Sequence, residues 1–175
     1  IARRGGSAVW GTYASFFQRT YDQLSQDVSI NNSPVTLIVV GASMYGMSDV
    51  THLCFFDIPL ISNIPNIVYF APTCVEEYLA VLNWSIEQKQ YPVAIRVPGM
   101  KVIHRSAKFA TDYSDINKFR LEKQGKKIAL IGVGNFYERA EKVAELIATK
   151  GIEATLINPL YLTGIDTEML KKKKK

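Results

Sequence analysis

Residues 9–23 read VWGTYASFFQRTYDQ, and this stretch decides the fold class. The short apolar run at 7–10 predicts a strand, and Gly11 and Thr12 predict a tight turn. Apolar side chains at helical spacing then predict a helix that runs to about residue 28. Such a turn lies at the carboxyl edge of an α/β sheet, where these folds bind ligands. We therefore expect an α/β fold with a ligand site at this turn.

Three side chains of this stretch are candidates for that site. Tyr13, Phe16 and Arg19 are three apart along the chain, so on a helix they share one face. Two flat rings and a planar cation suit a planar heterocycle and an anion. An alternative stays open, because an aromatic stripe on a helix commonly packs the core and leaves an adjacent arginine in solvent.

The following residues alternate between predicted strands and helices. The β-branched run at 35–40 is typical of a strand covered on both faces, and further strands are predicted at 66–72 and 92–99. A short helix is predicted from residue 51, with Ser48, Asp49 or Thr51 as its cap. A second helix opens at a Thr73–Glu76 capping box, with an apolar face of Val75, Leu79, Leu82 and Ile86. This alternation predicts a doubly wound, mainly parallel sheet.

The chain divides into two predicted domains with short additions. Residues 1–100 form the first domain, which opens on a helix end capped by glycine after Arg3 and Arg4. Residues 101–124 lack a clear period and predict a linker with a local hairpin. Residues 125–170 predict a partial second α/β domain, with strands at 127–131 and 153–157, Asn135 as a helix cap, Gly151 as the helix stop and a final helix beginning near 165. Residues 171–175 are a lysine tail.

Composition excludes several classes of partner. The net charge of +5 comes from the five terminal lysines, because the other 16 basic residues equal the 16 acidic ones. We therefore predict no nucleic-acid or membrane partner. Cys54 and Cys74 lack metal-ligand spacing and predict buried free thiols in a reducing compartment, although a disulfide stays open. No apolar run approaches the roughly 18 residues of a spanning helix, so a cytoplasmic location is expected.

Polar residues near the predicted strand ends extend the candidate site. His52 follows a glycine-bearing loop beside Asp49 and Thr51, where a substrate would lie, although it could equally face solvent. Arg96 ends a buried strand and needs an anionic partner, either a carboxylate of the fold or a ligand phosphate. Asp57 is expected to pair or cap locally.

Two further motifs give no site. His52 and His104 have no second ligand at metal-binding spacing, so no metal site is predicted within this chain. The Gly132-Val133-Gly134 turn has Tyr137 at the third glycine position of a dinucleotide motif, and it predicts only a tight turn.

Four segments, in this order and spacing, resemble the pyrimidine-binding domain of the transketolase superfamily of thiamine-diphosphate enzymes. They are GTYASFFQRTYDQ (11–23), VTLIVVGA (35–42), THLCFFDIPLISNIPNIVYFAP (51–72) and VAIRVPG (93–99). Within the superfamily, Thr51-His52, Phe56-Asp57 and Ile64-Pro65-Asn66 are most similar to the 1-deoxy-D-xylulose-5-phosphate synthases. Residues 126–166 are similar to the start of the carboxyl-terminal domain of the superfamily.

This resemblance implies roles for the candidate residues. Phe16 would stack on the aminopyrimidine of thiamine diphosphate, with Tyr13 in the same pocket and Arg19 beside it. His52 would be the catalytic residue that hydrogen-bonds the substrate, and Arg96 would hold a sugar phosphate. Asp49 would lie among the substrate-binding residues.

The resemblance also implies partners and a reaction. Mg²⁺ and the diphosphate would be held by a diphosphate-binding domain of the same or a partner chain, in a homodimer. The reaction would join pyruvate to glyceraldehyde 3-phosphate. A transketolase subunit acting on ketose phosphates and a non-catalytic structural relative remain alternatives. Gly41 stands where the synthases have arginine, Ser48-Asp49-Val50 stands where they have Asp-Gly-Pro, and the glutamate that activates their pyrimidine ring belongs to a preceding helix.

Overall fold

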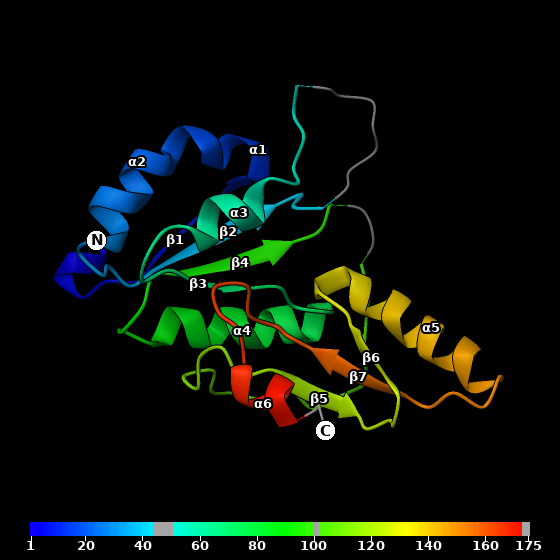
Figure 1. Cartoon of the computed structure of the whole chain (residues 1–175). Coiled ribbons are helices and arrows are strands. Elements are labelled where there is room, and N and C mark those ends of the chain that lie inside the picture. The colour runs from blue at the N-terminus through cyan, green and yellow to red at the C-terminus, as the bar shows by residue number, and fades with distance from the viewer. Residues whose placement is uncertain (44–50, 100–101, 173–175) are drawn as a thin grey trace.

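Two α/β units follow one another along the chain (Figure 1). The structure is a computed structural model that describes residues 1–43, 51–99 and 102–172. The first unit is built on a parallel sheet of four strands in the order β1-β2-β4-β3. These strands are β1 (Ala8–Tyr13), β2 (Val35–Val40), β3 (Val68–Phe70) and β4 (Val93–Val97). Their order and direction confirm the predicted parallel sheet.

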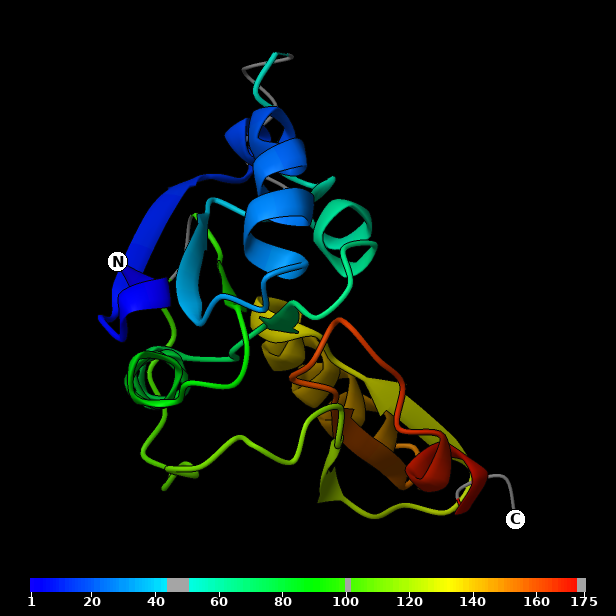
Figure 2. The same cartoon turned by 90° about the vertical axis from the view of Figure 1, so that its left-hand side faces the viewer.

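Helices cover both faces of this sheet. After β1 the chain winds through α1 (Ala14–Phe17), η2 (Gln18–Thr20), α2 (Tyr21–Gln23) and η3 (Leu24–Ser29), which confirms a helical run to about residue 28. Figure 2 shows α2 and α3 (Asp57–Ser62) on one face and α4 (Val75–Glu87) on the other. Phe17, Leu37 and Ile61 share one buried cluster. Val81 and Trp84 belong to a second cluster, so the sheet is doubly wound.

The second unit has a smaller mixed sheet with the order β5-β7-β6. β6 (Ile128–Ile131) is parallel to β7 (Ala154–Asn158), whereas β5 (Arg120–Lys123) is antiparallel to it. Its helices are η4 (Gly134–Phe136), α5 (Tyr137–Ala148) and α6 (Thr167–Lys172). The chain after β7 returns to the first sheet, where Leu160 O accepts from Ala71 N–H at 2.7 Å.

Two local predictions are confirmed. One is the glycine cap at the end of the first short helix, and the other is that both cysteines are buried free thiols. η1 (Ala2–Arg4) ends at Gly5, whose φ of 82° is the left-handed cap expected from the cations and glycines. Cys54 and Cys74 are buried and are not joined in a disulfide.

The predicted turn at Gly11 and Thr12 is wrong, because β1 continues through both residues to Tyr13. Gly11 pairs with Ile38 in the parallel ladder, and a Cβ on Gly11 would lie 3.0 Å from Ile38 Cβ. The glycine therefore permits a close approach of two strands rather than a reversal of the chain. The helix begins directly after Tyr13.

The helix predicted from residue 51 begins instead at Asp57. Pro59 is tolerated in the first turn of a helix, where its missing N–H would be unpaired, but not in the interior. Pro59 therefore places the helix start only two residues before it. Thr51 does not cap this helix, and the other two candidate caps, Ser48 and Asp49, lie outside the described residues.

The predicted capping box and apolar face of α4 are also wrong. The cap is Cys74, whose Sγ accepts from Glu77 N–H at 3.5 Å, and the carboxylate that reaches back to Thr73 belongs to Glu77 rather than Glu76. The buried face comprises Glu77, Val81, Trp84 and Ser85, whereas Leu79 of the predicted face is 47% exposed. Trp84 turns this face inward, because its ring packs edge-on against buried Phe70 at 5.6 Å.

Several boundaries of the second unit also differ from prediction. Asn135 lies inside η4 and is not the cap of α5, which ends at Ala148 rather than Lys150. Residues 120–123 of the predicted linker form β5, and no hairpin forms among its described residues. α6 extends into the predicted lysine tail, since that helix includes Lys171 and Lys172. The domain boundaries at 100 and 124 remain predictions.

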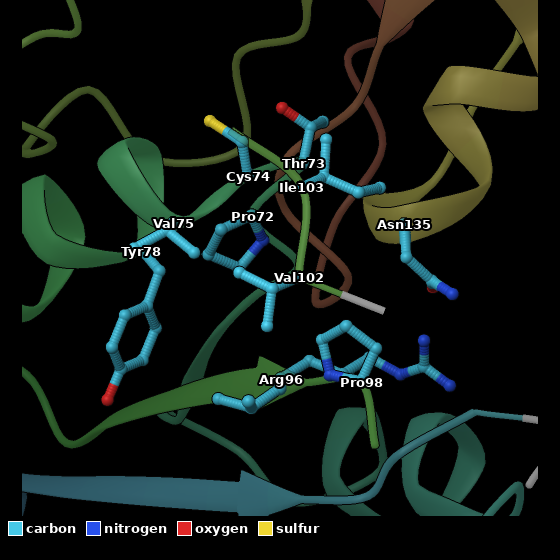
Figure 3. A pocket seen from close by; sticks show the side chains of 11 residues that line it. Pro72, Thr73, Cys74, Val75, Tyr78, Arg96, Pro98, Val102, Ile103 and Asn135 are labelled. Atoms are coloured by element: carbon cyan, nitrogen blue, oxygen red, sulfur yellow. The ribbon is translucent and has the colours of Figure 1, made fainter. Parts of the chain in front are cut away.

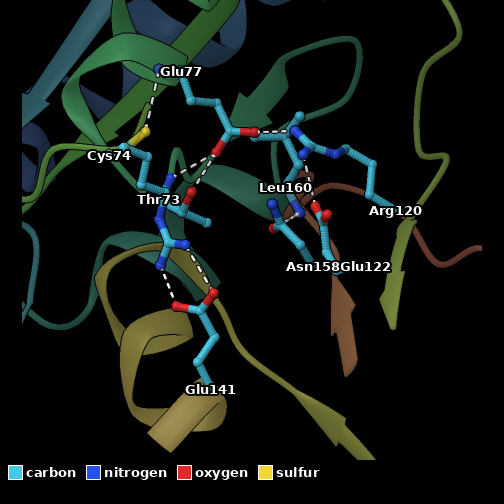
Figure 4. A network of polar contacts seen from close by, with 9 residues as sticks. Thr73, Cys74, Glu77, Arg120, Glu122, Glu141, Asn158 and Leu160 are labelled. Atoms are coloured by element: carbon cyan, nitrogen blue, oxygen red, sulfur yellow. Dashed lines mark hydrogen bonds and ion pairs between the residues drawn. The ribbon is translucent and has the colours of Figure 1, made fainter. Parts of the chain in front are cut away.

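A buried carboxylate ties the two units together. Glu77 of α4 is fully buried, and it accepts from Thr73 N–H at 2.8 Å and Thr73 Oγ1 at 2.9 Å. Its other oxygen accepts from Arg120 of β5, which also pairs with Glu122 at 2.7 Å (Figure 4). A buried charge is stable only when such partners surround it. Glu77 therefore fixes the position of β5 against α4.

Replacing Glu77 with alanine should destabilise the chain by about 2 kcal/mol or more, because Arg120 and the Thr73 donors lose their acceptor. Denaturant unfolding of the full chain measures this loss. Glu76→Ala is the matched control on the same helix, where the carboxylate is partly exposed, and it should cause a much smaller loss. Equal losses for the two variants would contradict the structural role of Glu77.

Candidate functional site

Exposed aromatic rings mark the carboxyl end of β1. Tyr13, the last residue of the strand, is 53% exposed, and Phe16 in α1 is 38% exposed. The neighbouring Phe17 is fully buried and supplies the core contact of this helix. Arg19 is exposed in η2. The alternative in which the Tyr13 and Phe16 rings pack the core is therefore wrong, and both ring surfaces are available to a ligand.

His52 joins this edge from the segment before α3. Its ring lies 5.3 Å from that of Phe16 in an edge-on arrangement, and its Nδ1 is 2.7 Å from Thr51 Oγ1. The ring is exposed but does not stand at a helix N-terminus. The structure thus brings His52 to the Phe16 ring, whereas Asp49 lies outside the described residues.

Gly41 completes the edge at the end of β2. Its φ of 69° is left-handed, and an added Cβ would lie 3.2 Å from Cδ1 of Tyr13. A side chain here would press on the tyrosine ring as well as strain the backbone. The edge can therefore stack a flat ligand on its rings and hydrogen-bond it through an imidazole.

A buried polar triad lies behind the ends of β3 and β4. Asp57 Oδ2 accepts from Arg96 Nε at 2.7 Å and from the Tyr69 hydroxyl at 2.5 Å, and Asp57 Oδ1 accepts from Arg96 Nη2 at 3.3 Å. Arg96 is only 8% exposed. Burial, followed by the charge of Asp57, raises the pKa of Tyr69, so its hydroxyl stays a donor.

Asp57 is the anion that pairs with Arg96. The partner is a carboxylate of the fold, which was the first of the two alternatives. Asp57 has a structural role, but the predicted local pairing is wrong, because its partners Arg96 and Tyr69 lie 39 and 12 positions further along the chain. Among the described residues Arg96 Nη1 has no hydrogen-bond partner, so one edge of the guanidinium remains for a further acceptor. Sequence reasoning missed Tyr69, although a tyrosine inside a buried strand signals a partner for its hydroxyl.

Two kinds of feature are absent from the described residues. No group of three or more histidine, cysteine, aspartate or glutamate side chains is arranged to hold a metal ion within residues 1–43, 51–99 and 102–172. None of the helices in those ranges has the length and apolar character needed to cross a membrane.

The fold and this edge define an α/β domain with exposed aromatic rings at the carboxyl end of a parallel strand, followed by a second α/β unit. Comparison with protein families specifies the class. Residues 1–103 match the family described as transketolase, pyrimidine binding domain, and residues 117–175 match transketolase, C-terminal domain. The chain therefore belongs to the transketolase family.

Relatives of known name agree with this assignment. The chain is 34% identical over 181 residues to 1-deoxy-D-xylulose-5-phosphate synthase of Clostridium acetobutylicum, an alignment that covers 98% of this chain and 28% of the relative. It is 35% identical over 178 residues to the enzyme of the same name from Clostridium tetani, with 98% and 27% covered. The chain thus spans little more than a quarter of the length of these relatives.

Solved structures share the fold. A split-gene transketolase described as an inactive β4 tetramer superposes with a TM-score of 0.81 at 21% identity, covering 98% of this chain and 55% of that one. Transketolase of Pichia stipitis in complex with sedoheptulose-7-phosphate gives 0.77 at 15% identity, covering 94% and 24%. At these identities the likeness concerns the fold alone.

Substitutions that remove the charge of Asp57 or the hydroxyl of Tyr69 should lower the free energy of unfolding. Asp57→Asn should destabilise the full chain by about 3 kcal/mol, because it leaves the Arg96 cation uncompensated. Tyr69→Phe should cost about 1 kcal/mol for one hydrogen bond. Denaturant unfolding measures both changes. The double variant Asp57→Asn/Arg96→Met should recover part of the first loss; a double variant less stable than Asp57→Asn alone would refute the ion-pair explanation.

Proposed function

We propose that this chain supplies the aminopyrimidine pocket and phosphate clamp of a thiamine-diphosphate-dependent transferase of the transketolase type. The observation that carries the proposal is the pair of exposed rings, Tyr13 and Phe16, at the carboxyl edge of the sheet in a chain of this family. Family membership and the names of the relatives favour 1-deoxy-D-xylulose-5-phosphate synthase chemistry, with pyruvate and glyceraldehyde 3-phosphate as substrates.

The exposed edge suits the cofactor that the family implies. Phe16 and Tyr13 offer ring surface to an aminopyrimidine, and Gly41 keeps the space beside Tyr13 free of a side chain. Thiamine diphosphate, when bound, supplies the carbanion chemistry that amino-acid side chains lack. The protein residues bind and orient: His52 hydrogen-bonds the substrate next to Phe16, and Arg19 lies on the same exposed edge for a carboxylate.

Arg96 is proposed as the phosphate clamp. Asp57 holds its Nε and Nη2, and the resulting fixed guanidinium presents Nη1 to a phosphate oxygen of the substrate. Asp49 is proposed as a further substrate-binding residue of the same edge. Fixing the cation in advance lowers the entropy lost when the phosphate binds.

The remaining parts of the proposed enzyme lie on other protein segments. Mg²⁺ and the diphosphate would be held by a diphosphate-binding domain, in the same chain or a partner chain, and the assembly would be a cytoplasmic homodimer. The chain alone would then be inactive. This proposal agrees with the small share of the relatives that the chain spans.

A different acceptor or a non-catalytic role is the second candidate. Gly41 places no cation at the edge beside Tyr13, at a position where the resemblance led us to expect arginine. An enzyme lacking this cation would hold a phosphorylated acceptor less tightly, or would serve as a structural partner. A transketolase reaction with ketose phosphates is the alternative within the enzyme class.

Phe16→Ala should weaken thiamine-diphosphate binding roughly two- to tenfold, the loss of about 0.5–1.5 kcal/mol expected for one aromatic contact. Calorimetric titration of the chain assembled with a diphosphate-binding domain measures the affinity. Phe136→Ala is a matched control, because Phe136 is equally exposed at 38% but lies in the second unit. Unchanged affinity in Phe16→Ala would remove Phe16 from the cofactor site.

Activity assays of the same assembly discriminate between the candidate functions. We expect consumption of pyruvate that depends on glyceraldehyde 3-phosphate, and little turnover of xylulose 5-phosphate. Arg96→Met should raise the KM for the phosphorylated acceptor far more than it lowers kcat, because the clamp binds a group remote from the reacting carbon. Turnover of xylulose 5-phosphate alone would favour transketolase, and no turnover with either substrate would favour the structural role.

A further inference from the structure

A short segment that follows β7, residues 159–163, lies along the free edge of β3, and we call it the return segment. β3 is an edge strand of the first sheet, so one side of its backbone would otherwise present unpaired N–H and C=O groups. The return segment occupies this side, because Leu162 N–H donates to Tyr69 O at 2.8 Å and Tyr69 N–H donates to Thr163 Oγ1 at 3.3 Å. Both backbone groups of Tyr69 are therefore held by a segment of the second unit.

The side chain of Tyr69 carries this constraint to Asp57. The Tyr69 ring is fully buried, and its hydroxyl donates to Asp57 Oδ2 at 2.5 Å. Rotation of an aspartate carboxylate about its Cβ–Cγ bond is only weakly restricted by the side chain itself. The hydrogen bond from the hydroxyl to one of the two oxygens therefore limits the rotation of the Asp57 carboxylate.

The ion pair between Asp57 and Arg96 is uneven. Arg96 Nε lies 2.7 Å from Asp57 Oδ2, the oxygen that also accepts from Tyr69, whereas Arg96 Nη2 lies 3.3 Å from Oδ1. Charge-assisted N–H···O bonds are about 2.7–2.9 Å long, so only one of the two bonds is short. Without the tyrosine hydroxyl, the carboxylate could turn into a symmetric two-bond pair and neutralise the guanidinium more completely. Tyr69 therefore leaves more of the Arg96 charge for a further anion.

A ligand can reach this guanidinium although Arg96 is only 8% exposed. The Arg96 side chain borders a pocket of about 230 Å³ beside the end of β4 (Figure 3). Among the described residues Arg96 Nη1 has no hydrogen-bond partner. The orientation that Asp57 imposes on the guanidinium therefore determines how Nη1 meets an incoming phosphate oxygen.

We propose that Tyr69, held at its backbone by the return segment, is a positioning residue for Arg96 in phosphate binding. The inference rests on the proposed role of Arg96 as the phosphate clamp. Tyr69 acts through Asp57, since its hydroxyl is bonded to the carboxylate and not to the ligand. The second unit thereby contributes to the affinity for the phosphorylated acceptor through its contacts with the backbone of Tyr69.

Tyr69→Phe removes the hydroxyl and keeps the buried ring. In the chain assembled with a diphosphate-binding domain, it should raise the KM for glyceraldehyde 3-phosphate about threefold to tenfold, the effect of one hydrogen bond. The value of kcat should change by less than about twofold, because the clamp lies away from the reacting carbon. Tyr161→Phe is the matched control: Tyr161 is also buried, and its hydroxyl donates to Tyr113 O at 3.0 Å rather than to the triad. Its KM should remain native.

Arg96→Met in the same assay separates the two possible failures. A native KM in Arg96→Met would remove the phosphate clamp and, with it, the role of Tyr69. A raised KM in Arg96→Met with a native KM in Tyr69→Phe would overturn the role of Tyr69 alone. An equal rise in Tyr69→Phe and Tyr161→Phe would also overturn it, because the effect would then follow from the loss of any buried hydrogen bond.

A spectroscopic test needs no turnover and includes the return segment. In the full chain labelled with ¹⁵N-arginine, the Nε–H signal of Arg96, assigned by its loss in Arg96→Met, should move in Tyr69→Phe because the carboxylate that accepts from it turns. Thr163→Val removes the acceptor of Tyr69 N–H and should move the same signal, and Thr163→Ser, which keeps the hydroxyl, should restore it. A native Arg96 signal in both Tyr69→Phe and Thr163→Val would refute the positioning role. A signal that moves only in Tyr69→Phe would refute the contribution of the return segment.

Discussion

The parallel pairing of β1 with β2 is the constraint on which the candidate site depends. Gly11 lies so close to Ile38 that an added Cβ would be in tight contact with the neighbouring strand, 3.0 Å from Ile38 Cβ. With this register, Tyr13 pairs with Val40, and both strands end at the same level. The helix after β1 and the left-handed Gly41 after β2 then leave the sheet at one edge. A shift of one residue would turn Tyr13 to the other face of the sheet and remove the ring from that edge.

The sequence predicts the regular parts of this arrangement and misses those set by tertiary packing. The β-branched run of β2 and the alternation of elements are local signals, so the parallel sheet follows from them. The buried face of α4 does not follow from local signals, because the row that contains Leu79 and Leu82 is as apolar as the row that is buried. Packing of Trp84 against Phe70 selects the buried face, and no local pattern contains that contact.

The candidate site, too, can be predicted where neighbouring residues determine it and not where contacts between distant parts of the chain do. The spacing of Tyr13 and Phe16 predicts neighbouring rings, but it does not say whether the core or a ligand receives them. Phe17 decides this, since its complete burial takes the core position and turns Phe16 outward. The partner of Arg96 lies 39 positions away in the chain, so the sequence supplies the need for an anion but not its identity.

The first unit meets the second through an apolar cluster that both share, with Leu160 and Tyr161 packed beside Phe70 and Trp84, and through one buried carboxylate, Glu77. Glu77 is held by Thr73 and Arg120, and Asp57 by Tyr69 and Arg96. Arg120 has a second partner in Glu122, so the loss of Glu77 would leave this cation with one carboxylate instead of two. Glu77 therefore joins the two units through an ion pair that crosses their junction, whereas Asp57 fixes the Arg96 guanidinium within the first unit, where both residues lie.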